Sequence, residues 1–173
     1  MGPASIRKAL AGYGVVCADG DAERLWDALN NVPLRHFNLR LFPDAIPTIG
    51  ALNEAGYTLA VATARPLTAK IVARELRDLG LPDVFRVIVT SGELGFRKSH
   101  PLVFESALAR LGVSPDEVLA VGDSYEEDIV PAAKLGMVPV LKLNDREPDA
   151  SWVLARYQIP SLAALLELEV FSR

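Results

Sequence analysis

The chain has 173 residues, half of them hydrophobic, and a net charge of −4 at pH 7. This length accommodates one α/β domain with a small appendage. The scattered Lys and Arg residues argue against binding to nucleic acid or to an anionic membrane surface. The single Cys17 excludes an intrachain disulfide and a multi-cysteine zinc site. Neither a signal-peptide pattern nor a bilayer-spanning apolar run is present, so we expect a cytoplasmic protein that does not enter the membrane.

The first 40 residues allow two interpretations. In one, residues 5–10 and 21–30 form helices, and Asp19 or Asp21 caps the second helix, whose apolar face carries Leu25, Trp26 and Leu29. In the other, the small apolar run 15–18 is a strand that ends in Asp19-Gly20-Asp21. We favour the helical interpretation.

From Leu41 onward, short apolar segments alternate with segments of helical periodicity. Such alternation predicts an α/β fold, with a parallel sheet covered by helices on both faces. We expect strands at 58–63, 84–89, 118–121, 138–142 and 157–159, and helices at 44–55, 67–79, 101–111, 128–135 and 161–168.

Two aspartates follow the apolar strand at 118–121. Asp123 stands where this strand ends, and Asp128 stands where the next helical pattern begins. Carboxylates held close together repel each other unless a cation lies between them, and Mg²⁺ is commonly held by one or two carboxylates, water and a substrate phosphate. The alternative is an ordinary strand-turn-helix in which Asp128 is a helix N-cap.

Two other expected loops at strand ends carry polar side chains suited to an anion. Thr63 closes its strand, and Ala64 and Arg65 are expected to open the next helix, where a hydroxyl and free N–H groups form an anion cradle. Lys98 lies in the loop before the helix at 101–111 and can neutralise a phosphate. Ligands bind at the carboxyl ends of parallel strands, so these residues and the aspartates are expected to share one site.

Three motifs follow one another along the chain: Thr63, then Arg97-Lys98 with Pro101, then Gly122-Asp123-Ser124 with Asp128. This order is typical of the haloacid dehalogenase-like (HAD) hydrolase superfamily, which the chain resembles from Leu41 to about Leu168. The resemblance implies a Rossmann-like core. It implies that Thr63 binds phosphate and that Lys98 steadies the nucleophile and the phosphoryl group. It also implies that Asp123 and Asp128 coordinate Mg²⁺ directly or through water. Ser99 stands where many relatives have proline.

The resemblance fails at the front of the chain. Family members attack phosphorus with the first aspartate of an Asp-x-Asp pair, at the end of a strand that lies between the strands ending here at Thr63 and Asp123. Only Asp19-Gly20-Asp21 formally fits that pattern. If residues 1–40 are instead a partial helical cap on a core at 41–173, the nucleophile lies upstream of Met1, and two strand edges lose their partner.

The resemblance implies a Mg²⁺-dependent phosphatase of a small phosphorylated metabolite, weakly active or inactive in this chain. Two alternatives stay open: a non-catalytic binding protein of the same fold, and a haloacid dehalogenase. Because dehalogenation needs no Mg²⁺, the paired aspartates favour phosphate chemistry. The substrate and the oligomeric state are left open.

Overall fold

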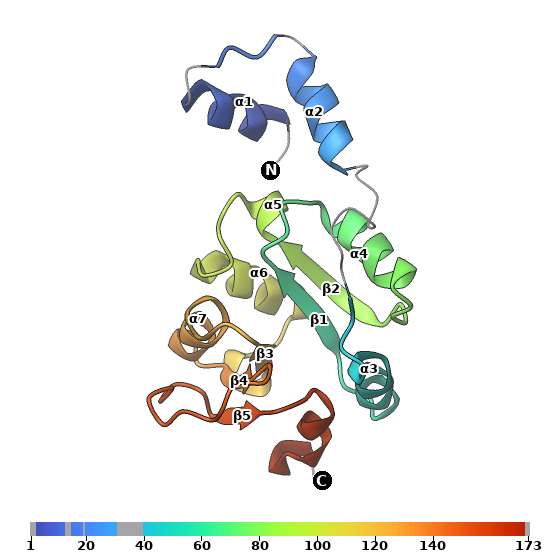
Figure 1. Cartoon of the computed structure of the whole chain (residues 1–173), viewed down its shortest axis with the longest axis vertical. Coiled ribbons are helices and arrows are strands. Elements are labelled where there is room, and N and C mark those ends of the chain that lie inside the picture. The colour runs from blue at the N-terminus through green and yellow to red at the C-terminus, as the bar shows by residue number, and fades with distance from the viewer. Residues whose placement is uncertain (1–2, 13–14, 19, 31–39, 172–173) are drawn as a thin grey trace.

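The computed structural model describes residues 3–12, 15–18, 20–30 and 40–171. Figure 1 shows helices on both sides of parallel strands, which confirms the predicted α/β class. The α-helices and strands are α1 (Pro3–Gly12), α2 (Asp21–Asn30), α3 (Ala45–Glu54), β1 (Leu59–Thr63), α4 (Ala69–Asp78), β2 (Phe85–Thr90), α5 (Ser91–Leu94), α6 (Pro101–Leu111), β3 (Leu119–Gly122), α7 (Val130–Lys134), β4 (Val138–Lys142) and β5 (Tyr157–Ile159). Shorter turns are the 3₁₀ segments η2 (Pro115–Glu117), η4 (Ala163–Glu167) and η5 (Glu169–Phe171), and the π-helix η3 (Tyr125–Ile129).

The strands form two parallel groups instead of one continuous sheet. In the first, β1 pairs with β2; in the second, β4 lies between β3 and β5. Within the described residues, no ladder joins β1 to β3. Figure 1 shows the two groups as neighbours, with β1 and β3 facing the interruption.

The interruption leaves apolar strand edges accessible to solvent. Val121 of β3 keeps 39% of its surface exposed, and Ala60 of β1 is also exposed, whereas Val89 of β2 and Val140 of β4 are fully buried. Strands of a parallel sheet covered by helices are normally buried on both faces. This exposure therefore lies on β1 and β3, the strands that face the interruption.

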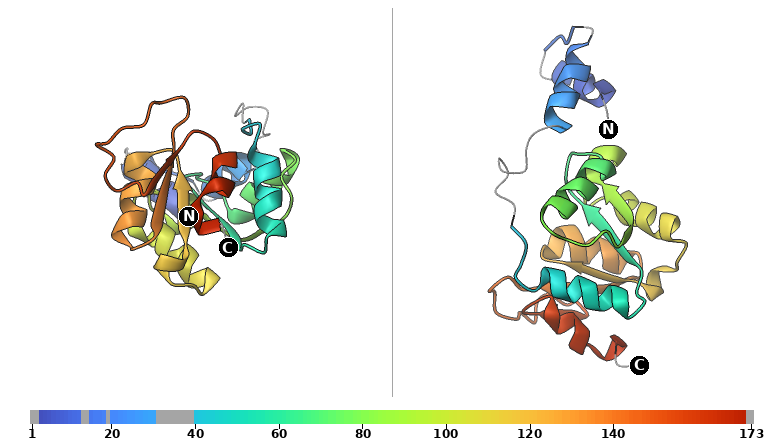
Figure 2. Two further views of the ribbon diagram at one scale, coloured as in Figure 1. Left: turned by 90° about the horizontal axis from the view of Figure 1, so that it is seen from below. Right: turned by 90° about the vertical axis from the view of Figure 1, so that its right-hand side faces the viewer.

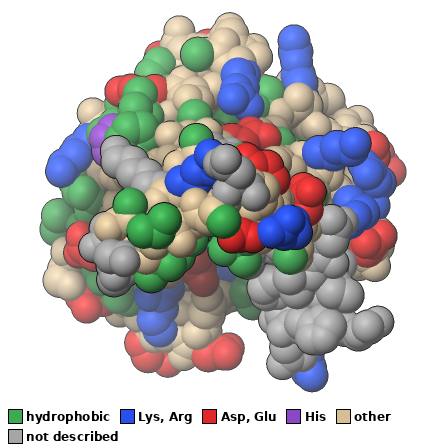
Figure 3. Space-filling model, turned by 90° about the horizontal axis from the view of Figure 1, so that it is seen from above, with side chains coloured by type: hydrophobic (Ala, Val, Ile, Leu, Met, Phe, Trp, Pro, Cys, Tyr) green, Lys and Arg blue, Asp and Glu red, His purple; other side chains and the backbone are tan. Residues whose placement is uncertain are grey.

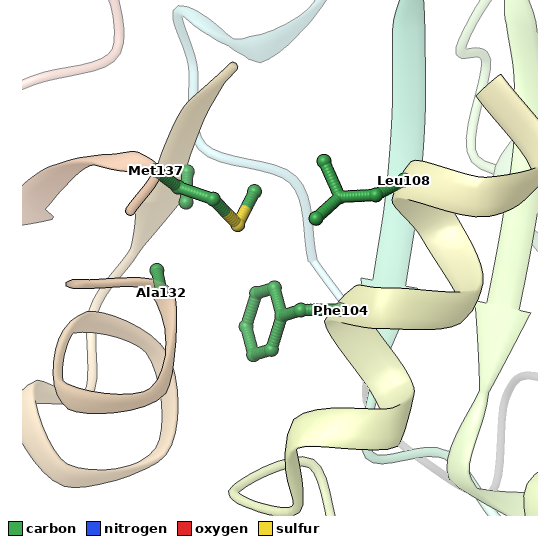
Figure 4. Close-up of a cluster of buried hydrophobic side chains, with 5 residues drawn as sticks. Phe104, Leu108, Ala132 and Met137 are labelled. Atoms are coloured by element: carbon green, nitrogen blue, oxygen red, sulfur yellow. The ribbon is translucent and has the colours of Figure 1, made fainter. Parts of the chain in front are cut away.

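One buried cluster spans the interruption and keeps the two groups together. Phe104 and Leu108 of α6 pack with Ala120 of β3, Ala132 of α7 and Met137, and Ala62 of β1 packs against the same cluster. Figure 4 shows the α6 side chains facing Met137 and Ala132 across the core. Burying apolar surface of this kind contributes roughly 25 cal/mol per Å². The helix layer therefore holds β1 near β3 without a backbone ladder.

The N-terminal residues are helical where the structure describes them. Helices α1 and α2 pack together, and Arg7 pairs with Glu23 at 2.8 Å. Residues 15–18 between them form no strand, and Val16 is 95% exposed. The strand interpretation of this segment is therefore wrong for the described residues. Asp19 lies outside them, while Asp21 begins α2.

Helices α1 and α2 lie apart from the two strand groups. Figures 1 and 2 show them beyond the carboxyl-terminal ends of β1 and β2. Leu25 on α2 keeps 41% of its surface exposed, so part of the expected apolar face is uncovered.

Two further expectations from the sequence concern membrane-spanning segments and the distribution of charge. None of the helices that the structure describes is both long and apolar enough to cross a bilayer. Acidic and basic side chains are interspersed over the described part of the face in Figure 3, in keeping with the scattered charge of the sequence.

Candidate metal and anion site

The end of β3 is built so that Asp128 folds back over it. The π-helix η3 begins just after the strand, and the N–H of Ile129 reaches the carbonyl of Ser124. Oδ2 of Asp128 accepts hydrogen bonds from the backbone N–H groups of Asp123 and Ser124, both at 3.1 Å. Turns of this type are frequent at functional sites. The helix predicted to start at Asp128 in fact starts as this π-turn at Tyr125, because the return of Asp128 to the strand end widens the turn.

Gly122 makes this return possible. A Cβ atom at position 122 would lie 2.2 Å from Oδ2 of Asp128 and 2.3 Å from its Cβ and Cγ. Real carbon atoms do not approach that closely, so any larger residue would displace the carboxylate. Glycine at this position is therefore a steric requirement for the placement of Asp128.

Lys98 supplies the charge that Asp128 needs. Its Nζ lies 2.6 Å from Oδ1 of Asp128, whose side chain is only 5% exposed. The angle falls outside hydrogen-bond geometry, so Oδ1 accepts no hydrogen bond from a described residue. At this distance the attraction between opposite charges still makes the contact an ion pair. A buried carboxylate without such a partner is strongly unfavourable.

Asp123 differs from Asp128 in being exposed to solvent. Its Oδ2 accepts a hydrogen bond of 2.7 Å from Nδ2 of Asn144. Its backbone carbonyl accepts one of 2.7 Å from the guanidinium of Arg146. Among the described residues no partner engages its Oδ1. Asp123 therefore presents a fixed carboxylate with one oxygen directed to solvent or to a ligand.

These residues fit a magnesium ion only in part. No cluster of three or more His, Cys, Asp or Glu side chains suited to a metal occurs among the described residues. Mg²⁺ does not need such a cluster, since it usually binds one or two carboxylates and fills its other positions with water and phosphate. Asp123 has an oxygen free for direct contact, whereas the oxygens of Asp128 are already engaged by two N–H groups and Lys98. The pair therefore fits an ion that Asp123 contacts directly, while Asp128 holds Lys98 and the turn after β3 in place.

The loop after β1 differs from the prediction. The helix expected from residue 64 or 67 begins at Ala69, because Pro66 disfavours a helical conformation at the residue before it and Thr68 is the N-cap. The N–H of Ile71 is bound by Thr68, and that of Ala69 donates to Oε1 of Glu93 at 2.8 Å. The N-terminus of α4 is therefore not the expected anion cradle, because protein groups already bind these two N–H groups. Anion binding by Thr63 and Ala64 stays a prediction.

The segment 63–68, which we call the threonine loop, is held by α5. The N–H of Gly92 donates to the carbonyl of Arg65 at 3.0 Å. A Cβ at position 92 would lie 2.5 Å from the backbone carbon of Pro66. The hydroxyl of Thr63 accepts a 3.3 Å hydrogen bond from the N–H of Arg65. The loop is thus fixed by close backbone contact with α5.

Arg65 turns its charge toward α4. Its guanidinium pairs with Glu75 at 2.6 Å, and Glu75 is 5% exposed. Burial raises the pKa of Glu75 above its ordinary value of 4.5, and the nearby Arg65 and Arg74 oppose part of that rise. Arg65 therefore has a structural partner, Glu75, within the fold. A role of Arg65 in substrate binding stays a prediction.

One pocket connects the two sides of the candidate site. It has a volume of about 310 Å³, and its lining residues come from the threonine loop, α5, the following loop and η3: Ala64, Pro66, Ser91, Gly95, Phe96, Arg97, Lys98 and Glu127. Ala64 and Lys98 therefore share a cavity. Thr63, Asp123 and Asp128 are not among its lining residues. The structure thus brings Lys98, Asp123 and Asp128 together by direct contacts and joins the threonine loop to them only through this pocket.

Sequence reasoning missed Asn144 and Arg146, which hold Asp123. A signal for Asn144 was available, because it follows the strand predicted at 138–142 and ligands gather at the carboxyl ends of parallel strands. Arg146 has no such signal, because its hydrogen bonds to the carbonyls of Asp123, Lys142 and Leu143 depend on how the loop folds back.

A profile of the haloacid dehalogenase-like hydrolases matches residues 4–136 of this chain. The chain belongs to this family. The part of the sequence that predicted this membership is the order of Thr63, Lys98, Asp123 and Asp128, together with the strands that precede three of these residues.

Similar proteins of known name include phosphatases. The chain is 40% identical over 114 residues to the glyceraldehyde 3-phosphate phosphatase of Methanopyrus kandleri, covering 64% of this chain and 48% of that protein. It is 37% identical over 132 residues to the ribulose-1,5-bisphosphate 5-phosphatase of Halopiger xanaduensis, covering 76% and 54%. The chain therefore spans about half the length of these relatives.

Solved structures of both enzyme types share the fold. A HAD phosphatase from Thermococcus onnurineus matches with a TM-score of 0.65 and 26% identity, over 95% of this chain and 86% of that one. The 2-haloacid dehalogenase from Pseudomonas syringae pv. Tomato matches with a TM-score of 0.67 and 26% identity, over 95% and 68%. Fold similarity alone thus does not separate phosphatase from dehalogenase chemistry.

Proposed function

We propose that this chain is the core of a Mg²⁺-dependent phosphatase that acts on a small phosphorylated metabolite. The observation that carries the proposal is the contact of 2.6 Å between Lys98 and the buried Asp128, next to the exposed Asp123. A cation, an ordered carboxylate pair and a pocket at strand ends make a site for a doubly charged anion with its metal. The named relatives that act on phosphorylated sugars support the same substrate class.

Each residue of the site has a separate role in this proposal. Asp123 would hold Mg²⁺ directly, and Asp128 would orient Lys98 and the turn after β3. Bound there, Mg²⁺ would neutralise charge on the phosphoryl oxygens. Lys98 would bind a phosphoryl oxygen from the pocket wall, and the threonine loop, through Thr63 and Ala64, would bind the phosphate from the other side.

The proposed chemistry also needs a nucleophile that the described residues do not place in the site. We propose that a strand ending in Asp-x-Asp occupies the interruption between β1 and β3. Two observations support this: the facing edges of these strands form no ladder with each other, and their apolar residues Ala60 and Val121 are exposed. Such a strand would place its first aspartate between Thr63 and Asp123, where nucleophilic attack on phosphorus requires it.

Helices α1 and α2 are proposed to be part of a cap (residues 1–40) on the core (residues 41–173). Their position beyond the carboxyl ends of β1 and β2 supports this, since a cap must lie over the strand ends that carry the site. A cytoplasmic location stays a prediction from the sequence.

Hydrolysis of p-nitrophenyl phosphate tests the proposed function. The chain alone should show little or no Mg²⁺-dependent turnover. A version extended at its N-terminus by an apolar strand ending in Asp-x-Asp should be at least about 100-fold faster, the scale on which positioned catalytic groups act. The same extension ending in Asn-x-Asn is the matched control and should stay inactive.

Two outcomes would contradict the proposal. Turnover by the chain alone that survives Asp19→Asn would show that no added nucleophile is needed. An extended chain that folds and binds Mg²⁺ but hydrolyses no phosphate ester would favour the second candidate, a non-catalytic binding protein.

A dehalogenase stays the minor alternative. The similarity to the Pseudomonas syringae enzyme is the observation in its favour. Release of halide from 2-chloropropionate by the extended chain, unaffected by removal of Mg²⁺, would support it over the phosphatase.

A further inference from the structure

Lys142 is a buried lysine beside the proposed metal site, and the proposed mechanism does not use it. It is the last residue of β4 and only 6% exposed. Its Nζ lies 3.6 Å from the centroid of the Phe42 ring and 2.6 Å from Oδ1 of Asn144. Among the described residues no carboxylate lies within ion-pair distance of this ammonium group.

Asn144 stands between this ammonium group and Asp123. Its side-chain oxygen accepts from Lys142, while its side-chain nitrogen donates to Oδ2 of Asp123 at 2.7 Å. The two contacts use the opposite ends of one amide, so a single neutral group separates the buried cation from the exposed carboxylate. An amide suits this position because it offers both an acceptor and donors.

The backbone around Asn144 is held in the required place. Asn144 and Asp145 are the described non-glycine residues with positive φ, at 50° and 66°, a region that Asn and Asp enter more readily than most residues. Arg146 then bonds to the carbonyls of Lys142, Leu143 and Asp123, with distances of 2.6–2.9 Å. These bonds hold the loop after β4 against the end of β3, so the side chain of Asn144 is held in position between Lys142 and Asp123.

We infer that Asn144 is a positioning residue that holds Oδ2 of Asp123 and separates Lys142 from it, so that Oδ1 stays available for a divalent cation. Without the amide, the ammonium group of Lys142 and the carboxylate of Asp123 lose the neutral group that both now contact. An ion pair between them would compete with a metal for the same carboxylate. This inference rests on the proposed metal site and adds the residue that keeps its ligand free.

The test is Mn²⁺ affinity, measured by electron paramagnetic resonance on the full chain and confirmed by Mg²⁺ competition. Asn144→Gly removes the amide, and glycine adopts the positive φ without strain. We expect affinity about tenfold weaker, the scale found when a group that orients a metal ligand is lost. Lys142→Met should stay within about threefold of the unchanged chain, by the same scale.

The double variant Lys142→Met/Asn144→Gly separates competition from a general loss of structure. It should recover affinity to within about threefold of the unchanged chain, because the competing cation is gone. A merely structural role for Asn144 predicts no recovery. Thermal unfolding checks that each variant is folded, and Asn144→Ser serves as the milder substitution, with weakening in the same direction, if Asn144→Gly does not fold.

Three results would overturn the inference. Asn144→Gly and Asn144→Ser with unchanged Mn²⁺ affinity would show that the amide does not matter. A double variant as weak as Asn144→Gly would show that Lys142 does not compete. Failure of the unchanged chain to bind Mn²⁺ would remove the proposed metal site, and the inference with it.

Discussion

The two sides of the candidate site are built in different ways. On the β3 side, Lys98, Asp123 and Asp128 are held by charge pairs and hydrogen bonds between side chains and the strand end. On the β1 side, the threonine loop is held by backbone contact with α5, and its one charged residue, Arg65, pairs with Glu75 on α4. The β3 side, which we propose to hold the metal, is therefore held by contacts of charged side chains, whereas the threonine loop is held by backbone contacts and turns its charged side chain toward α4. The following substitutions test this contrast, from the largest expected effect to the smallest.

Of these substitutions, Gly122→Ala should have the largest effect, because it disturbs the β3 side of the site. The added Cβ would lie 2.2 Å from Oδ2 of Asp128, so the carboxylate must move and its contact with Lys98 must break. We expect a loss of about 3 kcal/mol in the free energy of unfolding, measured with urea, the upper end for overpacking, together with weaker Mn²⁺ binding. Gly50→Ala in α3 is the control, since nothing lies within 4 Å of its added Cβ. It should raise stability by up to about 1 kcal/mol. A Gly122→Ala variant as stable as the unchanged chain would contradict the steric argument.

Gly92→Ala should damage the β1 side alone. Its Cβ would lie 2.5–2.7 Å from backbone atoms of Pro66 and Leu67, so the threonine loop must shift. The expected cost is about 2–3 kcal/mol of unfolding free energy. Mn²⁺ affinity should stay unchanged, because the residues that hold Asp123, which are Asn144 and Arg146, lie on the loop after β4. Equal weakening of metal binding by Gly92→Ala and Gly122→Ala would show that the two sides are not independent.

Lys98→Met should leave the buried Asp128 without its counter-charge. Complete loss of a buried partner costs about 3–5 kcal/mol, but Lys98 is itself 19% exposed, and water can replace part of the interaction. We therefore expect a loss of about 1–2 kcal/mol in unfolding free energy. Lys70→Met is the control for charge removal, because Lys70 lies on an exposed part of α4. Equal stability changes in the two variants would show that the Lys98–Asp128 pair adds nothing.

Glu75→Gln should have the smallest effect of these substitutions, which is a change in how the free energy of unfolding depends on pH. Burial raises the pKa of Glu75 above 4.5, so its carboxyl binds a proton more tightly in the folded chain than in the unfolded chain. That contribution to stability is complete below pH 4.5 and is lost as pH rises through the raised pKa. The stability of the variant relative to the unchanged chain should therefore increase with pH over this window in urea titrations. Glu54→Gln, on the exposed end of α3, controls for loss of charge. A difference that stays flat or falls with pH would contradict the assignment.

Much of the core was predictable because its signals are local. Apolar runs bounded by turn residues placed β4 and β5 at the observed bounds, and Gly112 ended α6 as expected, in a left-handed conformation. The interruption between β1 and β3 was only one of the outcomes that the sequence left open, because no local pattern shows whether two strand edges pair with each other.

Some of the missed features depend on local details of a turn or a cap, and others depend on contacts distant in sequence. The start of α4 was placed too early because hydrophobic spacing outweighed Pro66 and the Thr68 cap. The π-turn η3 follows from the return of Asp128 over Gly122, which helical periodicity does not encode. The partners of Asp123 lie on the loop after β4, far along the chain, and the pairing of Arg65 with Glu75 depends on how α4 packs.

The most direct test of a cation site at Asp123 is to locate a bound paramagnetic ion by nuclear magnetic resonance. Mn²⁺ added to the ¹⁵N-labelled chain should broaden the amide signals of Gly122, Asp123, Ser124 and Asn144 first, and Mg²⁺ in excess should restore them. Asp123→Asn should abolish the effect while the rest of the spectrum stays folded. Broadening centred on other residues, or unchanged in the Asp123→Asn variant, would contradict the account.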